Sequence, residues 1–222
     1  MKTLNQIVEN GVCTLTLNRP QVFNSFNQEM AFELQAALDF CAQEEKIRAV
    51  VITGEGKAFC AGQDLAEATD PNGPALQDIV AKHYNPIILK IRALEKPVIA
   101  AVNGVAAGAG ANIALACDLV IAKESAAFIQ AFSKIGLIPD SGGTFFLPRL
   151  VGAQKALALM LTGDKVMAPE AEAMNMIYKA VSEEEFEQTV SNLATQLAKM
   201  PTKAFGLTKK AVNASFNRTL EE

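Results

Sequence analysis

One carboxylate stands out for its surroundings. Asp140 follows an apolar run and precedes two glycines, in the segment Ile135-Gly-Leu-Ile-Pro-Asp-Ser-Gly-Gly-Thr144. A carboxylate in an apolar pocket is a candidate acid or base, because desolvation perturbs its pKa. The alternative interpretation is that Asp140 is the N-cap of a helix beginning after the two glycines. The residues alone leave both interpretations open.

Other kinds of catalytic centre are disfavoured. Ser141 does not form a nucleophile elbow, because Pro139 stands where the G-x-S-x-G motif needs glycine. The only histidine, His83, has no motif around it, which argues against a Ser-His-Asp triad. One histidine cannot form a three-histidine metal site, and no other cluster of metal ligands is evident. We therefore expect no metal site.

A glycine-rich segment, Gly104-Val-Ala-Ala-Gly-Ala-Gly110, lies between a predicted strand and a predicted helix. It is not the dinucleotide-binding fingerprint G-x-G-x-x-G, because the third glycine would fall at Ile113. Two interpretations remain. The small residues allow the helix to pack closely on the strand, or backbone N–H groups at the helix N-terminus face a ligand oxygen.

A second segment, Ala58-Phe-Cys-Ala-Gly-Gln-Asp-Leu65, follows another predicted strand. Gly62 is expected to adopt a backbone angle that other residues avoid. We interpret Asp64 first as the N-cap of a helical turn over residues 65–68, with a role as a base as the alternative.

Short strands and helices alternate along the chain, which is typical of the α/β class. The predicted strands cover residues 12–17, 49–53, 98–102 and 119–122. The predicted helices cover residues 28–44, 75–94, 109–117, 154–161, 169–174, 182–199 and 204–217. Pro86 is expected to kink the second of these helices or to divide it.

Composition narrows the class of function. The 222 residues are 50% hydrophobic, which suffices for one domain with a sizeable core. A formal net charge of −4 without a basic block argues against nucleic acid as a partner. The four cysteines form no paired motif and are interpreted as reduced thiols that serve as small hydrophobic residues, which favours a cytoplasmic location. Residues 1–11 are polar, unlike a signal peptide. Residues 98–116 are apolar but contain asparagines and glycines, so we expect no membrane span.

Several motifs occur in the order and spacing of one family. Together they resemble the enoyl-CoA hydratase/isomerase, or crotonase, superfamily over essentially the whole chain. The motifs are Asn18-Arg19-Pro20 followed by Asn24-Ser25, Phe59-Cys-Ala-Gly-Gln-Asp64, Lys96-Pro-Val-Ile-Ala-Ala-Val-Asn-Gly104, Gly108-Ala-Gly110, Cys117-Asp118 and Gly136-Leu-Ile-Pro139 followed by Gly142-Gly143-Thr144. The resemblance implies a crotonase-type spiral of ββα units over residues 1–199. Residues 200–222 would begin a C-terminal helical region that is incomplete here, and the protein would be a homotrimer or hexamer.

The resemblance also implies a site for an acyl-CoA thioester, with coenzyme A as part of the substrate and no separate cofactor. By position, the backbone N–H groups of Gln63 and Ala109 would form an oxyanion hole, and Asp140 would be the acid/base. The coenzyme and the acyl group would lie against a further set of residues, namely Phe23, Asn24, Ala61, Asp64, Leu65 and Gly108.

Two departures from the family pattern bear on the activity. Hydratases of this family place two glutamates across the pocket, and the matching positions here are Asn112 and Phe132. The implied activity is therefore an isomerase that uses Asp140 alone. The segments around it resemble the phenylacetate-degrading branch, which converts 1,2-epoxyphenylacetyl-CoA to oxepin-CoA. The alternatives are an enoyl-CoA hydratase or Δ3,Δ2-enoyl-CoA isomerase of fatty-acid oxidation, and a non-catalytic acyl-CoA-binding member of the fold.

Overall fold

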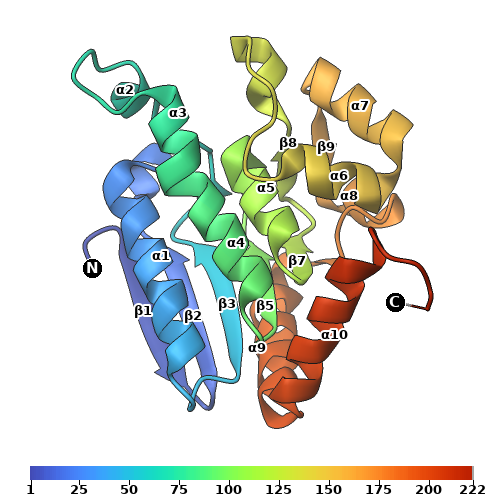
Figure 1. The fold of residues 1–222 in the computed structure, drawn as a ribbon. Helices are drawn as coiled ribbons and strands as arrows, with labels where there is room; N and C mark the ends of the chain where they lie inside the picture. Colours follow the sequence, from blue (N-terminus) through green and yellow to red (C-terminus); the bar gives the residue numbers. More distant parts are fainter. Residues whose placement is uncertain (222) are drawn as a thin grey trace.

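A six-stranded sheet forms the centre of the computed structural model, which describes residues 1–221 (Figure 1). In spatial order its strands are β1 (Leu4–Glu9), β2 (Val12–Leu17), β3 (Ala49–Gly54), β5 (Val98–Val102), β7 (Leu119–Lys123) and β10 (Lys179–Val181). β1 runs antiparallel to β2, and the other neighbours are parallel. The central strands are continuous apolar runs because both of their faces are covered.

A smaller sheet contains β4 (Ala58–Cys60), β6 (Val105–Ala107), β8 (Ala127–Ile129) and β9 (Lys165–Met167). Each of β3, β5 and β7 in the large sheet is followed along the chain by a strand of this small sheet, and then by helical segments. Gly104 makes one of these crossings possible, because a Cβ there would lie 2.1 Å from the carbonyl oxygen of Lys57. The chain therefore repeats a ββα unit, which confirms the predicted spiral.

Helices cover both faces of the large sheet (Figure 1). On one face α1 (Gln28–Gln43), α4 (Asn85–Ala93) and α5 (Ala109–Ala116) enclose the main hydrophobic core. On the other face α9 (Glu183–Lys199) packs Phe186 and Ala194 against Ile99 and Ile121. The remaining α-helices are α2 (Leu65–Ala68), α3 (Leu76–Asp78), α6 (Gly143–Val151), α7 (Ala153–Thr162), α8 (Ala168–Ala173) and α10 (Thr202–Ser215). The first turn of α5 thus begins inside the molecule, between the two sheets and α4.

Most of the predicted elements are confirmed to within a few residues. The predicted helix over residues 75–94 is divided into α3, a π-helix η2 (Ile79–Tyr84) and α4. The division lies directly before Pro86, which lacks the N–H that a continuous α-helical ladder needs. Strand β1 has no counterpart among the predicted elements, because five of its six side chains are at least partly exposed and no apolar alternation marks it. The small-sheet strands are three residues each, too short for a period to show.

The last helix, α10, is attached to the core through partly buried charges. The Lys209 ammonium lies 2.6 Å from the Asp118 carboxylate and 3.0 Å from the carbonyl oxygen of Lys96. Arg92 also reaches Asp118, at 3.4 Å, and hydrogen bonds to Asn213 of α10. Residues 202–215 are therefore fixed on the core, while the division of the chain at residue 199 stays a prediction.

All four cysteines are free and buried, which confirms that they serve as small core residues. Within residues 1–221, no helix is both long enough and apolar enough to cross a membrane. The same residues bring together no group of three or more His, Cys, Asp or Glu side chains that could hold a metal ion.

Candidate active site

The segment after β4 presents the backbone N–H of Gln63. Phe26 lies beside this segment: its N–H donates to the carbonyl of Gly62 at 2.7 Å, and its carbonyl accepts from the N–H of Asp64 at 2.8 Å. In a parallel pairing of this kind, the residue between the two bonded neighbours points its own N–H to the other side. The Gln63 N–H therefore points away from Phe26, and it donates to no protein group among the described residues.

Ala109 supplies a second N–H at the start of α5. As the first residue of the helix, it has no intrahelical acceptor for that group. Gly108 before it has φ +52° and ψ −126°, a conformation open to glycine. Gly62 has φ +97°, and a Cβ there would lie 3.0 Å from the carbonyl oxygen of Ala107 and 3.7 Å from the nitrogen of Ala109. The predicted backbone role of Gly62 is confirmed, and the two bare segments bring both candidate donors to one place.

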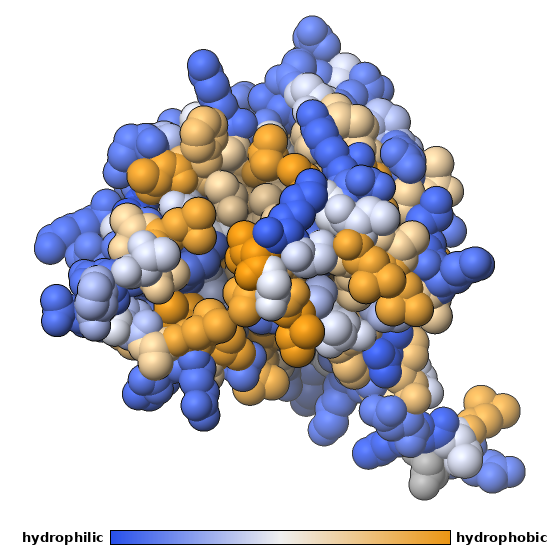
Figure 2. Space-filling model, turned by 90° about the horizontal axis from the view of Figure 1, so that it is seen from above, coloured by the Kyte–Doolittle hydropathy of each residue, from blue (hydrophilic) through white to orange (hydrophobic). Residues whose placement is uncertain are grey.

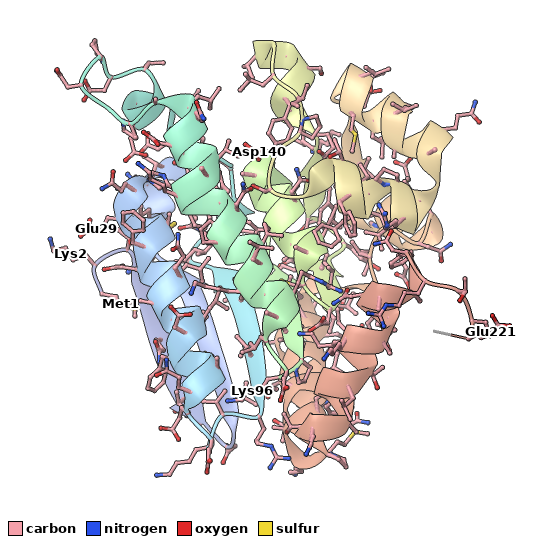
Figure 3. All side chains as sticks on the ribbon, in the orientation of Figure 1. Met1, Lys2, Glu29, Lys96, Asp140 and Glu221 are labelled. Carbon is pink, nitrogen blue, oxygen red and sulfur yellow. The ribbon has the colours of Figure 1, made fainter. Side chains whose placement is uncertain are left out.

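Asp140 lies in the loop between the 3₁₀-helix η3 (Ala131–Ile135) and α6, near the upper end of α5 (Figure 3). The N-cap of α6 is Gly142, without a side-chain bond, so the interpretation of Asp140 as a helix cap is wrong. The carboxyl group is half-buried, and this burial raises its pKa above the ordinary value. The Ser141 hydroxyl donates to Oδ1 at 2.9 Å and partly offsets that rise. A raised pKa suits a group that must take up a proton and return it.

The Asp140 loop is tied to α5 close to Ala109. The Nδ2 of Asn112 donates to the backbone carbonyl of Asp140 at 2.9 Å. Asn112 follows Ala109 by three residues, so it lies on the same face of the helix, about 4.5 Å further along the axis. Phe132 is buried, and its ring approaches to 3.9 Å from where a Cβ on Gly108 would stand. The two positions matched to glutamates thus both border the α5 N-terminus, and neither carries an acid.

Three of the residues assigned to the coenzyme and acyl group lie at the surface. Phe23, Ala61 and Leu65 are exposed, and Leu65 is 62% accessible. Ile138, two residues before Asp140, is 82% accessible. Figure 2 shows the molecule from above, where hydrophobic side chains gather near the middle of the face. Exposed apolar side chains of this kind suit an apolar or amphipathic ligand.

Two other residues of that set use their side chains within the protein. Asn24 is fully buried and donates to the backbone carbonyls of Glu55 and Ala58. The Asp64 carboxylate caps α2 by accepting from the N–H of Ala66 at 3.0 Å, and it pairs with Arg19 at 2.7 Å. The interpretation of Asp64 as an N-cap is confirmed. Contacts from Asn24 or Asp64 to a coenzyme would therefore come from the backbone.

A tyrosine beside the candidate donors was not predicted by the sequence analysis. Tyr84 is buried at the end of the π-helix, and its hydroxyl donates to the Oε1 of Gln63 at 2.7 Å. The Nε2 of Gln63 in turn donates to Glu67 at 3.0 Å. Burial raises the pKa of Tyr84 well above its ordinary value, so the hydroxyl stays a neutral donor. Because the π-turn sets the direction of this side chain, helical periodicity could not place it.

A separate groove of about 490 Å³ lies between the open face of the large sheet and α9. Thr14, Val51 and Phe186 are among the residues that line it. Gln63, Ala109 and Asp140 are not, so this groove is not the site described above.

The spiral fold, the two free N–H groups and the Asp140 carboxylate are the features of an acyl-CoA enzyme of the crotonase type. The chain belongs to the enoyl-CoA hydratase/isomerase family, whose model matches residues 8–222. The family assignment made from the motifs is thereby confirmed.

The relatives carry both isomerase and hydratase names. The chain is 49% identical to the 1,2-epoxyphenylacetyl-CoA isomerase of Escherichia coli, over 96% of this chain and 83% of the relative. It is 45% identical to a probable enoyl-CoA hydratase of Rhodobacter capsulatus, over 98% of this chain and 84% of that protein. The crystal structure of an enoyl-CoA hydratase of Mycobacterium smegmatis superposes with a TM-score of 0.91 at 32% identity, covering 100% of this chain and 86% of that one. The family is settled by these matches, and the reaction must be argued from the site.

Proposed function

We propose that this protein is an acyl-CoA isomerase that moves a proton from the α to the γ carbon of a thioester, and that its substrate is 1,2-epoxyphenylacetyl-CoA. The observation that carries the proposal is the half-buried carboxylate of Asp140, held beside the first turn of α5 with no acid at positions 112 and 132. The 49% identity to an isomerase named for this substrate supports the choice of acyl group.

The mechanism uses only groups of this chain. The N–H groups of Gln63 and Ala109 donate to the thioester oxygen, which becomes an enolate oxygen when the α-proton leaves. Asp140 takes that proton with its carboxylate and returns it to the γ carbon on the same face. The epoxide opens to the seven-membered oxepin by electron reorganisation, so no proton beyond the one held by Asp140 is needed. Two such backbone donors contribute several kcal/mol to the stability of the enolate.

Two other activities use the same parts. A Δ3,Δ2-enoyl-CoA isomerase would need the same transfer of a proton between α and γ carbons, on a straight-chain substrate. A hydratase would need a second acid or base to activate water, and the neutral side chains at 112 and 132 disfavour it. A non-catalytic acyl-CoA-binding protein would have no use for a half-buried carboxylate with a raised pKa.

We also propose that the protein acts as a homotrimer or hexamer in the cytoplasm and needs no cofactor beyond the coenzyme A of its substrate. Light scattering of the protein tests the assembly. A monomer would contradict the proposal.

The reaction is tested by analysing products after incubation with a set of acyl-CoA thioesters. The set contains 1,2-epoxyphenylacetyl-CoA formed in situ, 3-hexenoyl-CoA and crotonyl-CoA. We expect conversion of the epoxide to oxepin-CoA, at a higher kcat/KM than the shift of the 3-hexenoyl double bond. Efficient hydration of crotonyl-CoA would overturn the isomerase proposal. A preference for 3-hexenoyl-CoA would retain the proton transfer and overturn the choice of substrate.

A further inference from the structure

We infer that Asn112 and Gln130 are positioning residues, which form a one-way chain of hydrogen bonds that holds Asp140 against α5. The inference rests on the proposed role of Asp140 as the acid/base. It assigns a task to the two amide side chains beside the site, neither of which can itself act as an acid or a base.

The chain of bonds has one direction. Gln130 donates from Nε2 to the Oδ1 of Asn112 at 2.8 Å, and Asn112 donates from Nδ2 to the backbone carbonyl of Asp140 at 2.9 Å. A carbonyl can only accept, so Nδ2 must face Asp140 and Oδ1 must face Gln130. Asn112 is 0% exposed and Gln130 is 4% exposed, so water does not compete for these bonds.

The Asp140 loop is shaped to receive Asn112. A Cβ on Gly143 would lie 2.4 Å from Nδ2, so the amide packs directly on the bare backbone of that glycine. The N–H of Gly143 also donates to the Asp140 carbonyl, at 2.8 Å. This contact explains one glycine of the pair: Gly143 leaves room for the Asn112 side chain, which holds the Asp140 carbonyl.

The loop needs an external restraint. Ser141 has φ +50° and Gly142 has φ +74°, two successive residues in the left-handed region, which is costly for a serine. The hydrogen bond from Asn112 of α5 to the Asp140 carbonyl, which acts as a clamp, stabilises this turn. Because the carboxylate stands on the same residue as the clamped carbonyl, its position relative to the Ala109 N–H is set through Asn112.

An unpaired oxygen on Gln130, the first residue in the chain of hydrogen bonds, indicates that this glutamine has a functional role. Its Oε1 is buried and has no hydrogen-bond partner among the described residues. A buried acceptor without a partner is unfavourable for folding, so stability alone would select an apolar residue at this position. The group that makes glutamine useful here is the Nε2 that orients Asn112.

The first test is Asn112→Asp, which keeps the shape and the acceptor but turns a carboxylate oxygen toward the Asp140 carbonyl. We expect kcat to fall by about 10²-fold, the scale of a small misplacement of a catalytic group, with acyl-CoA affinity within about twofold of wild type. The deuterium isotope effect at the α carbon should rise, because proton transfer becomes fully rate-limiting. Asn103→Asp is the matched control, since Asn103 also donates to backbone carbonyls, of Gly56 and Ala58, but lies outside the site. It should keep its kcat.

The second test is Gln130→Leu, which removes the donor to Asn112 together with the unpaired oxygen. We expect an unchanged or higher melting temperature with a lower kcat, a combination that a purely structural residue would not give. Wild-type kcat in both Asn112→Asp and Gln130→Leu, with Asp140→Asn inactive, would overturn the positioning role and leave the proposed function standing. An active Asp140→Asn would overturn the proposed function itself. Equal losses in Asn112→Asp and Asn103→Asp would also refute the inference.

Discussion

Replacement of Ala109 by proline removes one proposed oxyanion donor and leaves the helix that carries it. Ala109 is the first residue of α5, where the fixed φ of proline suits a helix and no intrahelical hydrogen bond is lost. The preceding Gly108 has ψ −126°, outside the α region that a following proline disfavours. We therefore expect Ala109→Pro to fold.

The expected size of the effect follows from the number of donors. The loss of one of two oxyanion donors costs about 2.7–4 kcal/mol of transition-state stabilisation. Since each 1.36 kcal/mol is a factor of ten, kcat should fall by about 10²–10³-fold. The Gln63 N–H remains, so turnover should stay measurable. The pyrrolidine ring also enters the space toward which the N–H pointed, so KM should rise.

The assay compares kcat and KM for Ala109→Pro and Ala109→Gly, with circular dichroism to check folding. The glycine variant keeps the N–H and should keep most of kcat. A chromophoric enoyl-CoA bound in the site should show a smaller red shift with Ala109→Pro, because the carbonyl is less polarised. A folded proline variant with wild-type kcat would refute the donor assignment. So would a glycine variant as inactive as the proline variant.

Three further predictions concern the surroundings of these groups. Ser141→Ala removes a bond that favours the ionised carboxylate, so the pKa of Asp140 should rise and the acid limb of the kcat–pH profile should move to higher pH; an unmoved or lower limb would speak against Asp140 as the base. Tyr84→Phe keeps the ring but releases the Gln63 side chain, and steady-state kinetics should show kcat reduced by up to about tenfold, the worth of one hydrogen bond, with KM little changed. A raised KM with normal kcat would show that Tyr84 acts in substrate binding instead. The wild-type protein should hydrate crotonyl-CoA only in traces, as measured by the loss of enoyl absorbance. Rapid hydration would contradict the isomerase proposal.

The order of elements and the location of the chemistry could be predicted from local sequence. Runs such as Val98-Ile-Ala-Ala-Val102 are apolar because they lie between two layers of helix, and this pattern is visible without a structure. The backbone role of Gly62 and the cap at Asp64 follow from what glycine and aspartate do in any chain. These features depend on neighbours within a few residues.

The features that sequence reasoning missed depend on contacts between distant segments. Tyr84 reaches Gln63 only because a π-turn precedes Pro86, and no periodicity marks a π-turn. Gln130 hydrogen bonds to Asn112, and Asn112 hydrogen bonds to Asp140, so the contacts join three separate segments of the chain. The alternative of Asp140 as a cap could not be removed from sequence either, because it depended on which residue begins α6.

The central claim is that Asp140 transfers the proton, and Asp140→Asn tests it most directly. The amide keeps the shape of the side chain and cannot act as a base. The folded state raises the pKa of Asp140, so at neutral pH it disfavours the ionised form, and the amide relieves that penalty. The variant should therefore melt at the same or a higher temperature at pH 7, and this difference should vanish below the unfolded-state pKa. A melting temperature no lower than that of wild type and an unchanged acyl-CoA affinity would show that a loss of activity comes from the missing base and not from a loss of the fold.

The measurement is the rate of deuterium incorporation at the α carbon of phenylacetyl-CoA in D₂O, followed by NMR for wild type and Asp140→Asn. Phenylacetyl-CoA carries α-protons but no ring oxygen, so the exchange reports proton abstraction alone. We predict that the variant binds the thioester normally and exchanges its α-protons at least about 10²-fold more slowly than wild type, the lower end for a general acid–base group. Exchange at the wild-type rate by a folded Asp140→Asn would show that another group is the base and would contradict the account.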